Sequence, residues 1–145
     1  MAASEQNISN HARYIFGFHI VLSALVAMIF FRAALMVGRS FTGDHLWMLA
    51  EASALMIFYW YVRAFPVGVQ DRVIRLEMRL RLERLLPPEQ FARFDQLAVG
   101  QVVALRFASD AELPGLVGLV LEGKLVGRGE IKKRIQNWQA DPVRI

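Results

Sequence analysis

The amino-acid sequence predicts an all-α membrane protein in which a transmembrane helical hairpin precedes a small cytoplasmic helical domain. Two long apolar runs, residues 14–37 and 46–65, lie close together in the first half of the chain. The composition is 55% hydrophobic with a mean hydropathy of +0.34, which is unusual for a water-soluble domain of this size. The tail of residues 66–145 is richer in charge and is long enough for one small domain with a thin core.

The two apolar runs have the length of membrane-spanning helices. A helix needs about 20 mostly apolar residues to cross about 30 Å of hydrocarbon. Because lipid offers no partner to backbone N–H and C=O groups, each run must satisfy them internally as a helix. The polar residues 38–45 then connect two antiparallel spans. A signal peptide is the alternative for the first run, but signal peptides have a shorter apolar core, and no clear cleavage motif follows Arg32.

Basic residues near the membrane ends predict the orientation of the hairpin. Lys and Arg beside a span favour the cytoplasmic side, and the connection between the runs carries only Arg39, offset by Asp44. Arginines flank the other ends: Arg13, Arg63, Arg72, Arg75, Arg79 and Arg81. We therefore expect the N-terminal segment, residues 1–13, and the tail, residues 66–145, to be cytoplasmic.

Two opposite charges lie within the apolar runs. Folding the chain about the centre of the connection places Arg32 and Glu51 at matching depth on antiparallel helices. Charges in lipid are costly and face partners or water, and an ion pair between these two offsets part of that cost. The pair is interpreted as a structural contact that fixes the register of the hairpin. An ion or proton pathway is the alternative, and Arg32 is also close enough to the outer end to snorkel.

Small residues predict a further packing face on each span. Ser23, Ala27 and Ala34 share one face of the first helix, opposite Arg32, while Ala50 and Ala54 form a small pair on the second. Small faces allow close helix packing in lipid. Because two helices alone cannot use both faces of the first span, we expect a homo-oligomer or a partner membrane protein. The alternative is that the alanines simply face lipid.

Beyond the spans, Pro66 and Gly68 are expected to end or kink the second helix. The stretch 69–86 alternates apolar and charged residues, as a strand does, but its composition favours a helix. As a helix it has one apolar stripe at Val69, Val73, Leu76 and Leu80, and another at Ile74, Met78, Leu82 and Leu85. Such a helix packs on two sides, one against its own domain and one against a neighbour.

The rest of the tail predicts short helices around a core. Pro88 begins a helix that carries Phe91, Phe94 and Leu97 inward, and residues 101–107 continue as helix. Ser109 and Glu112 have the spacing of a capping box for a helix ending near Lys124. A last helix, residues 130–139, carries Ile131, Ile135 and Trp138 toward the core.

The sequence offers little support for a catalytic, metal-binding or nucleotide-binding site. It has no cysteine, and its three histidines lie too far apart for a metal site. Nucleotide-binding and hydrolase motifs are absent, and the glycines of residues 123–129 have the wrong spacing for a phosphate loop. Asp110 and Glu112 fit helix capping better than a catalytic pair of carboxylates. We therefore expect no catalytic residue, no metal and no cofactor.

Basic residues of the tail are expected to contact anionic lipid headgroups near the membrane surface, where each contributes about 1 kcal/mol. Acidic residues interleave with them, which argues against nucleic acid as a partner. Positive-inside topology alone is the alternative explanation. The residues are Arg72, Arg75, Arg79, Lys132, Lys133 and Arg134.

Three stretches of the tail resemble an uncharacterised group of small bacterial membrane proteins. They are VQDRVIRLEMRLRLERLLP at residues 69–87, QVVALRFASDAELPGLV at residues 101–117 and IKKRIQNWQAD at residues 131–141. The resemblance also covers the NHARY segment before the first span. It implies a bacterial inner-membrane protein and carries no functional residue over to this chain.

Taken with the missing catalytic motifs, the architecture favours a non-enzymatic interaction, assembly or accessory subunit of a bacterial inner-membrane complex. A small oligomeric channel or transport component using Glu51 and Arg32 is the alternative function. Which partner, which oligomer and which pathway are involved does not follow from the sequence.

Overall fold

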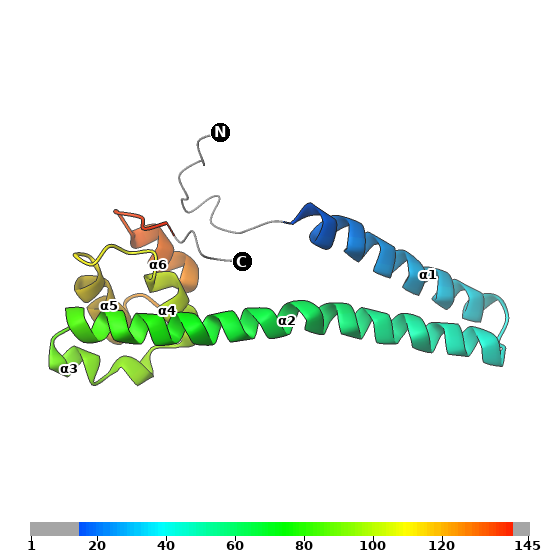
Figure 1. The fold of residues 1–145 in the computed structure, drawn as a ribbon, viewed down its shortest axis with the longest axis horizontal. Coiled ribbons are helices and arrows are strands. Elements are labelled where there is room, and N and C mark those ends of the chain that lie inside the picture. Colours follow the sequence, from blue (N-terminus) through cyan, green and yellow to red (C-terminus); the bar gives the residue numbers. More distant parts are fainter. Residues whose placement is uncertain (1–14, 141–145) are drawn as a thin grey trace. The chain divides into compact units, whose positions relative to one another are not determined.

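The computed structural model describes residues 15–140, and these fold into helices joined by short connections (Figure 1). In the described range the only strand-like pairing is a single antiparallel bridge between Ala108 and Trp138. The elements are a π-helical turn η1 (Gly17–Leu22), α1 (Ser23–Arg39), α2 (Gly43–Leu85), α3 (Pro88–Phe91), a 3-10 turn η2 (Phe94–Gln96), α4 (Val99–Leu105), α5 (Leu113–Leu121) and α6 (Arg128–Arg134). The predominantly helical fold predicted from the sequence is confirmed.

Two stretches of helix, Gly17–Arg39 and Gly43–Leu85, are long and apolar enough to cross a membrane. The connection between them is shorter than the polar break in the sequence, because α1 continues to Arg39 and α2 already begins at Gly43. His45 helps close this turn. Its Nδ1 lies 2.8 Å from the carbonyl oxygen of Ser40, and its backbone N–H donates to Thr42 Oγ1 at 3.3 Å.

The second helix does not end at Pro66, contrary to one of the two outcomes expected from the sequence. α2 runs through Pro66 and Gly68 without interruption to Leu85. A proline inside a helix costs about 3 kcal/mol because one hydrogen bond is lost. Helix propagation is cooperative, and strong helix formers such as Arg72, Leu76 and Glu77 follow a few residues later. One unfavourable position therefore does not terminate the helix, and the predicted separate helix of residues 69–86 is the last part of α2.

The chain divides into two compact units, one of residues Tyr14–Gly68 and one from Val69 onward. The first is the helical hairpin, and the second is the tail. Their boundary falls inside α2, two residues after Pro66.

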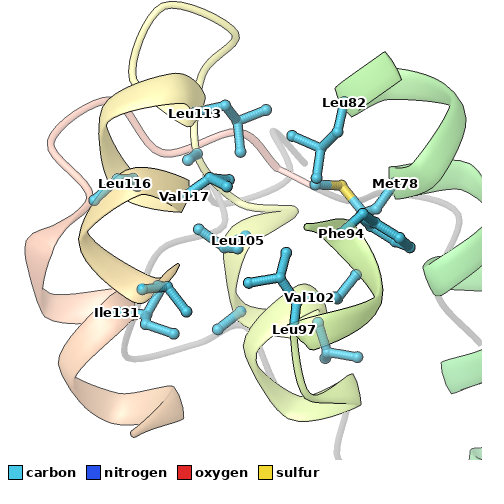
Figure 2. Close-up of a cluster of buried hydrophobic side chains, with 14 of the residues drawn as sticks. Met78, Leu82, Phe94, Leu97, Val102, Leu105, Leu113, Leu116, Val117 and Ile131 are labelled. Atoms are coloured by element: carbon cyan, nitrogen blue, oxygen red, sulfur yellow. The ribbon is translucent and has the colours of Figure 1, made fainter. Parts of the chain in front are cut away.

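The tail has its own hydrophobic core. Figure 2 shows side chains from α2, α4, α5 and α6 converging on one cluster. Leu82, Leu105, Leu113 and Ile131 are fully buried in it, and Phe94 and Leu97 of the α3–α4 connection close one side. Among the described residues, no polar or charged residue is buried. The inward positions predicted for Phe94, Leu97 and Ile131 are confirmed.

Several helix boundaries of the tail differ from those predicted, including α4, which spans Val99–Leu105 instead of residues 101–107. The helix expected after Pro88 splits into α3 and η2, each of about one turn. α5 begins at Leu113, and Ser109 is not its N-cap. Instead, the carbonyl oxygen of Ser109 accepts the backbone N–H groups of Glu112 and Leu113, both at 3.1 Å, which closes a turn before the helix.

The last helix is also shorter than predicted. α6 ends at Arg134, and Ile135 has extended backbone angles. Ile135 nevertheless packs against the core, and the Trp138 ring stacks on Phe107 with 4.4 Å between ring centroids. The backbone N–H of Gln139 donates to the carbonyl oxygen of Phe107 at 2.7 Å. An extended segment beside residues 107–108 thus delivers the tryptophan that a helix was expected to deliver.

Candidate interaction sites

The hairpin contains an open cavity of about 430 Å³ between α1 and α2. Both charged residues of the apolar runs, Arg32 and Glu51, line it, together with apolar side chains. The antiparallel arrangement that the sequence predicted for these residues brings them to one site. Within residues 15–140, however, no ion pair within 4.0 Å joins Arg32 to Glu51, so direct pairing stays a prediction. The other lining residues are Met28, Ile29, Ala33, Met48, Ala52 and Leu55.

The contact between α1 and α2 uses different small residues from those singled out in the sequence. Val26 and Ala33 of α1 and Ala52 of α2 are the buried residues of the described hairpin. Val26 and Ala33 are seven residues apart and therefore share one face of the helix.

The predicted small-residue face of α1 lies beside this contact, whereas that of α2 lies on the side of the helix opposite Ala52. Ser23, Ala27 and Ala34 are half-buried, whereas Ala50 and Ala54 are exposed. The hydroxyl of Ser23 donates to the carbonyl oxygen of His19 within the same helix. The role of these residues in oligomer packing stays a prediction.

Aromatic side chains join the two helices at the end of the hairpin opposite the connection. The rings of Phe18 and Tyr59 stack with 5.2 Å between centroids. His19 follows in the π-helical turn, and its Nδ1 lies 3.0 Å from the carbonyl oxygen of Ile15. His19 thus has a backbone contact within its own helix.

Two of the arginines expected at lipid headgroups have partners inside the tail. Arg75 donates to the carbonyl oxygen of Leu97 at 2.8 Å and to Asp95 Oδ1 at 3.4 Å, and its guanidinium lies 4.9 Å from the Phe94 ring centroid. Arg79 Nη1 lies 3.9 Å from the same Asp95 oxygen. Both arginines therefore tie α2 to the connection before α4, which the sequence did not indicate.

The remaining predicted headgroup residues are placed differently. Arg72 on α2 and Lys133 and Arg134 on α6 are exposed. Lys132 is half-buried, and its Nζ lies 5.2 Å from the Phe107 ring centroid. Lipid contact by these residues stays a prediction.

Arg81 is the most connected polar residue that sequence reasoning missed. Its Nε donates to Asp110 Oδ1 at 2.7 Å, Nη1 donates to the carbonyl oxygen of Arg106 at 3.0 Å, and Nη2 donates to that of Ala108 at 2.8 Å. The planar fork of a guanidinium can donate to several acceptors at once, which a lysine cannot reproduce. Arg81 fastens α2 to the turn between α4 and α5, where Asp110 was expected to cap a helix.

Glu112 fastens the other side of the same turn. Its Oε1 accepts the backbone N–H groups of Gln136 at 3.1 Å and Asn137 at 3.0 Å. Burial by itself would raise the pKa of Glu112, but hydrogen bonds from the N–H groups of Asn137 and Gln136 and from Ser109 together outweigh it and hold that pKa below its usual value. The capping-box position thus carries a carboxylate that secures the extended segment after α6.

A second cavity, of about 300 Å³, lies beside Arg81 in the tail. Its lining includes the charged residues Glu77, Arg81 and Arg106 and the apolar residues Ile74 and Met78. Within the described chain, no cluster of His, Asp and Glu is suited to hold a metal ion. The cavity therefore brings charged and apolar side chains of α2 next to Arg106.

The two apolar stripes of α2 have different surroundings. Ile74, Met78 and Leu82 are buried in the tail core, and Leu85 packs against it. The opposite stripe is exposed: Val69 at 61%, Val73 at 49%, Leu76 at 61% and Leu80 at 57%. The two-sided character predicted from the sequence is thus confirmed for the core side, and the other side is open to solvent.

Comparison with known proteins assigns the chain to a family without assigning an activity. No curated protein and no solved structure matches it. A family model matches residues 1–145, which is the whole chain. The protein therefore belongs to a family of unknown function, DUF6526.

Proposed function

We propose that this protein is a membrane-anchored, non-enzymatic assembly or accessory subunit of a bacterial inner-membrane complex. The observation that supports this most directly is the exposed apolar stripe of α2 on an otherwise closed domain. Contiguous exposed apolar surface on a folded domain marks interaction sites. The polar groups of the tail, such as Arg81 and Glu112, serve contacts within the domain and leave that stripe free for a partner.

The anchor is the hairpin. Few residues of the two candidate spans are buried: 11% in the most apolar part of Gly17–Arg39 and 6% in that of Gly43–Leu85. Side chains such as Phe31, Trp47 and Trp60, each more than 60% exposed, suit a lipid environment. The arginine asymmetry supports an orientation in which both chain ends are cytoplasmic.

Reporter fusions test this orientation. A reporter active only in the cytoplasm should work at Ile145 and fail when it is inserted in the connection at Phe41. The reverse pattern would contradict both the orientation and contact of the tail with the inner leaflet.

The subunit role is tested on the native membrane. A tagged full-length chain is solubilised in mild detergent, and its complexes are weighed intact by native mass spectrometry. We expect a homo-oligomer or a complex with another membrane protein. A monomer without any bound protein would contradict the proposal.

A small oligomeric channel or transport component is the second candidate, favoured by the cavity that Arg32 and Glu51 share. In that case Glu51→Gln should preserve the assembly and abolish ion or proton flux in liposomes. Ser53→Ala is a suitable control, because Ser53 lies on the same helix and its hydroxyl bonds to the carbonyl oxygen of Leu49 at 2.7 Å. Flux in the wild type that Glu51→Gln removes and Ser53→Ala retains would favour the channel over the accessory subunit.

A further inference from the structure

The exposed stripe of α2 has the spacing of a coiled-coil seam. Val69, Val73, Leu76 and Leu80 follow one another at intervals of four, three and four residues. This is the alternation of a and d positions in a heptad, with valine and leucine at 73 and 76 as an a and d pair. At about 100° per residue, all four fall within one narrow face of the helix, opposite Ile74, Met78 and Leu82 in the core.

The seam has defined ends and flanks. Glu83 occupies the next d position after Leu80, and Pro66 occupies the a position before Val69, so the apolar seam is confined to residues 69–80. Arg72 takes a g position and Glu77 takes an e position beside it. Both are exposed, and within the described chain neither forms an ion pair.

These flanking charges select the partner. Arg72 and Glu77 are five residues apart and cannot pair on one helix, where partners lie three or four residues apart. In a parallel two-stranded coiled coil, a g residue meets the e residue five positions later on the other strand. Arg72 of one copy therefore meets Glu77 of a second copy, and twofold symmetry forms the pair twice.

We propose that the stripe of residues 69–80 is a parallel homodimer seam, with Arg72 of each copy paired to Glu77 of the other. The proposal rests on the membrane anchoring proposed above, because two copies inserted in the same orientation in one bilayer present α2 in parallel. The seam spans about 17 Å at about 1.5 Å per residue. Such a short seam depends on confinement to the membrane, which raises the effective concentration of the second copy.

The pattern fits a second copy better than a lipid surface. Helices that lie on membranes carry Lys and Arg on both sides of their apolar face. Within residues 69–80, Arg72 flanks one side and Glu77 the other, with Arg84 on the Glu77 side lying beyond the seam, so an anionic surface would attract one flank of the seam and repel the other. Arg79, the second basic residue on the Arg72 side, lies 3.9 Å from Asp95 of its own domain.

Disulfide trapping in native membranes tests the seam, because the chain has no cysteine of its own. Single variants Val69→Cys, Val73→Cys, Leu76→Cys and Leu80→Cys are oxidised in full-length protein. Val126→Cys is the matched control, since Val126 is an apolar side chain that is 67% exposed away from the stripe. We expect each stripe variant to form several-fold more disulfide-linked dimer than Val126→Cys. Trapping at both ends, Val69 and Leu80, is expected only for the parallel arrangement.

Charge reversal tests the pairing in the Leu76→Cys background. Arg72→Glu alone and Glu77→Arg alone should each reduce the trapped dimer several-fold, and the two together should restore it. Equal trapping at Val126→Cys, or no trapping from a chain that is present in the membrane fraction, would overturn the seam and leave the subunit role standing. Absence of the chain from the membrane fraction would overturn the subunit role and, with it, the parallel seam. Charge variants that change flotation with phosphatidylglycerol vesicles without changing the trapped dimer would identify a lipid surface and overturn the seam as well.

Discussion

Large apolar side chains are mostly exposed in the hairpin and mostly buried in the tail. In the described hairpin the buried residues are Val26, Ala33 and Ala52, while large side chains such as Phe16 and Phe31 are 65% and 67% exposed. In the tail, the largest apolar side chains lie in one core, and Leu105 and Phe107 are fully buried. The exposed stripe of α2 is the main exception in the tail.

This difference is the one expected if the hairpin is the membrane anchor proposed above and the tail is in water. Burying apolar surface is favourable by about 25 cal/mol per Å² in water, so the tail gains stability by closing its core. The hairpin leaves such surface open, as the proposed membrane anchor would in lipid. Inside lipid, small contacts such as that of Ala33 and Ala52, and paired polar groups, decide the packing. The same chain thus follows two sets of packing rules on either side of Gly68.

The largest effect is expected at the charged pair of the hairpin. If Arg32 and Glu51 pair in the membrane, Arg32→Leu or Glu51→Leu alone leaves an unmatched charge, which costs about 3–5 kcal/mol where the site is buried. Snorkelling to the interface would lower that figure. The double change leaves no orphan charge and should restore part of the loss. Thermal unfolding of all four proteins in detergent measures the coupling, and additive losses would exclude pairing.

A matched pair of leucine truncations tests the comparison itself. Leu105→Ala removes a fully buried side chain of the tail core and should cost about 2–5 kcal/mol of the free energy of unfolding. Leu35→Ala removes a hairpin side chain that is 62% exposed, and should cost less than about 1 kcal/mol in detergent or lipid.

The measurement requires a probe confined to the tail. Replacing Trp47 and Trp60 by Phe leaves Trp138, stacked on Phe107, as the one tryptophan of the chain. Its fluorescence during chemical denaturation should then report loss of the tail. Equal losses for Leu105→Ala and Leu35→Ala would contradict the division into two packing regimes.

The sequence predicted elements defined by long patterns better than those that depend on single residues. Two apolar runs sufficed to predict the long helices, and the spacing of Ile74, Met78 and Leu82 predicted the core face of α2. The prediction that Pro66 ends the helix was wrong because cooperative helix formation on both sides outweighs the local cost of one proline. The short helices after Pro88 shifted because each has only one or two turns, so tertiary contacts decide where they begin.

The polar contacts of the tail could not be predicted for a different reason. Arg81 meets Asp110, which lies 29 residues further along the chain, and Glu112 meets Asn137, 25 residues further. Neither distance has a periodic signal in the sequence. Arg81 resembled the other arginines of α2, and only the fold separates it from exposed Arg84. The cavity shared by Arg32 and Glu51, by contrast, follows from antiparallel register alone.

A smaller effect is expected from removing the guanidinium fork of Arg81. Arg81→Lys keeps the charge but cannot donate to Asp110 and to the carbonyl oxygens of Arg106 and Ala108 at once. We expect a loss of about 1–3 kcal/mol in the unfolding free energy of the tail. Arg84→Lys, three residues later on an exposed position, should change it by less than about 0.5 kcal/mol. A similar loss in both variants would show that the contacts of Arg81 contribute nothing specific.

The smallest effect concerns the carboxylate of Glu112 and depends on pH. Its folded pKa is lowered: burial raises the pKa, and the hydrogen bonds from Asn137, Gln136 and Ser109 together outweigh that effect. A lowered pKa means that the ionised form stabilises the fold above the ordinary pKa of glutamate, and that this contribution is lost as the pH falls through the folded value. Glu112→Gln should therefore destabilise the tail by about 1 kcal/mol at neutral pH, and the difference from wild type should vanish in acid. Glu89→Gln, at an exposed position in α3, is the control for a surface carboxylate outside this contact. Trp138 fluorescence during unfolding, recorded from neutral pH down to pH about 3, measures the stability of each variant relative to wild type. If the loss in Glu112→Gln does not change with pH, the charge of Glu112 is not what holds the extended segment in place.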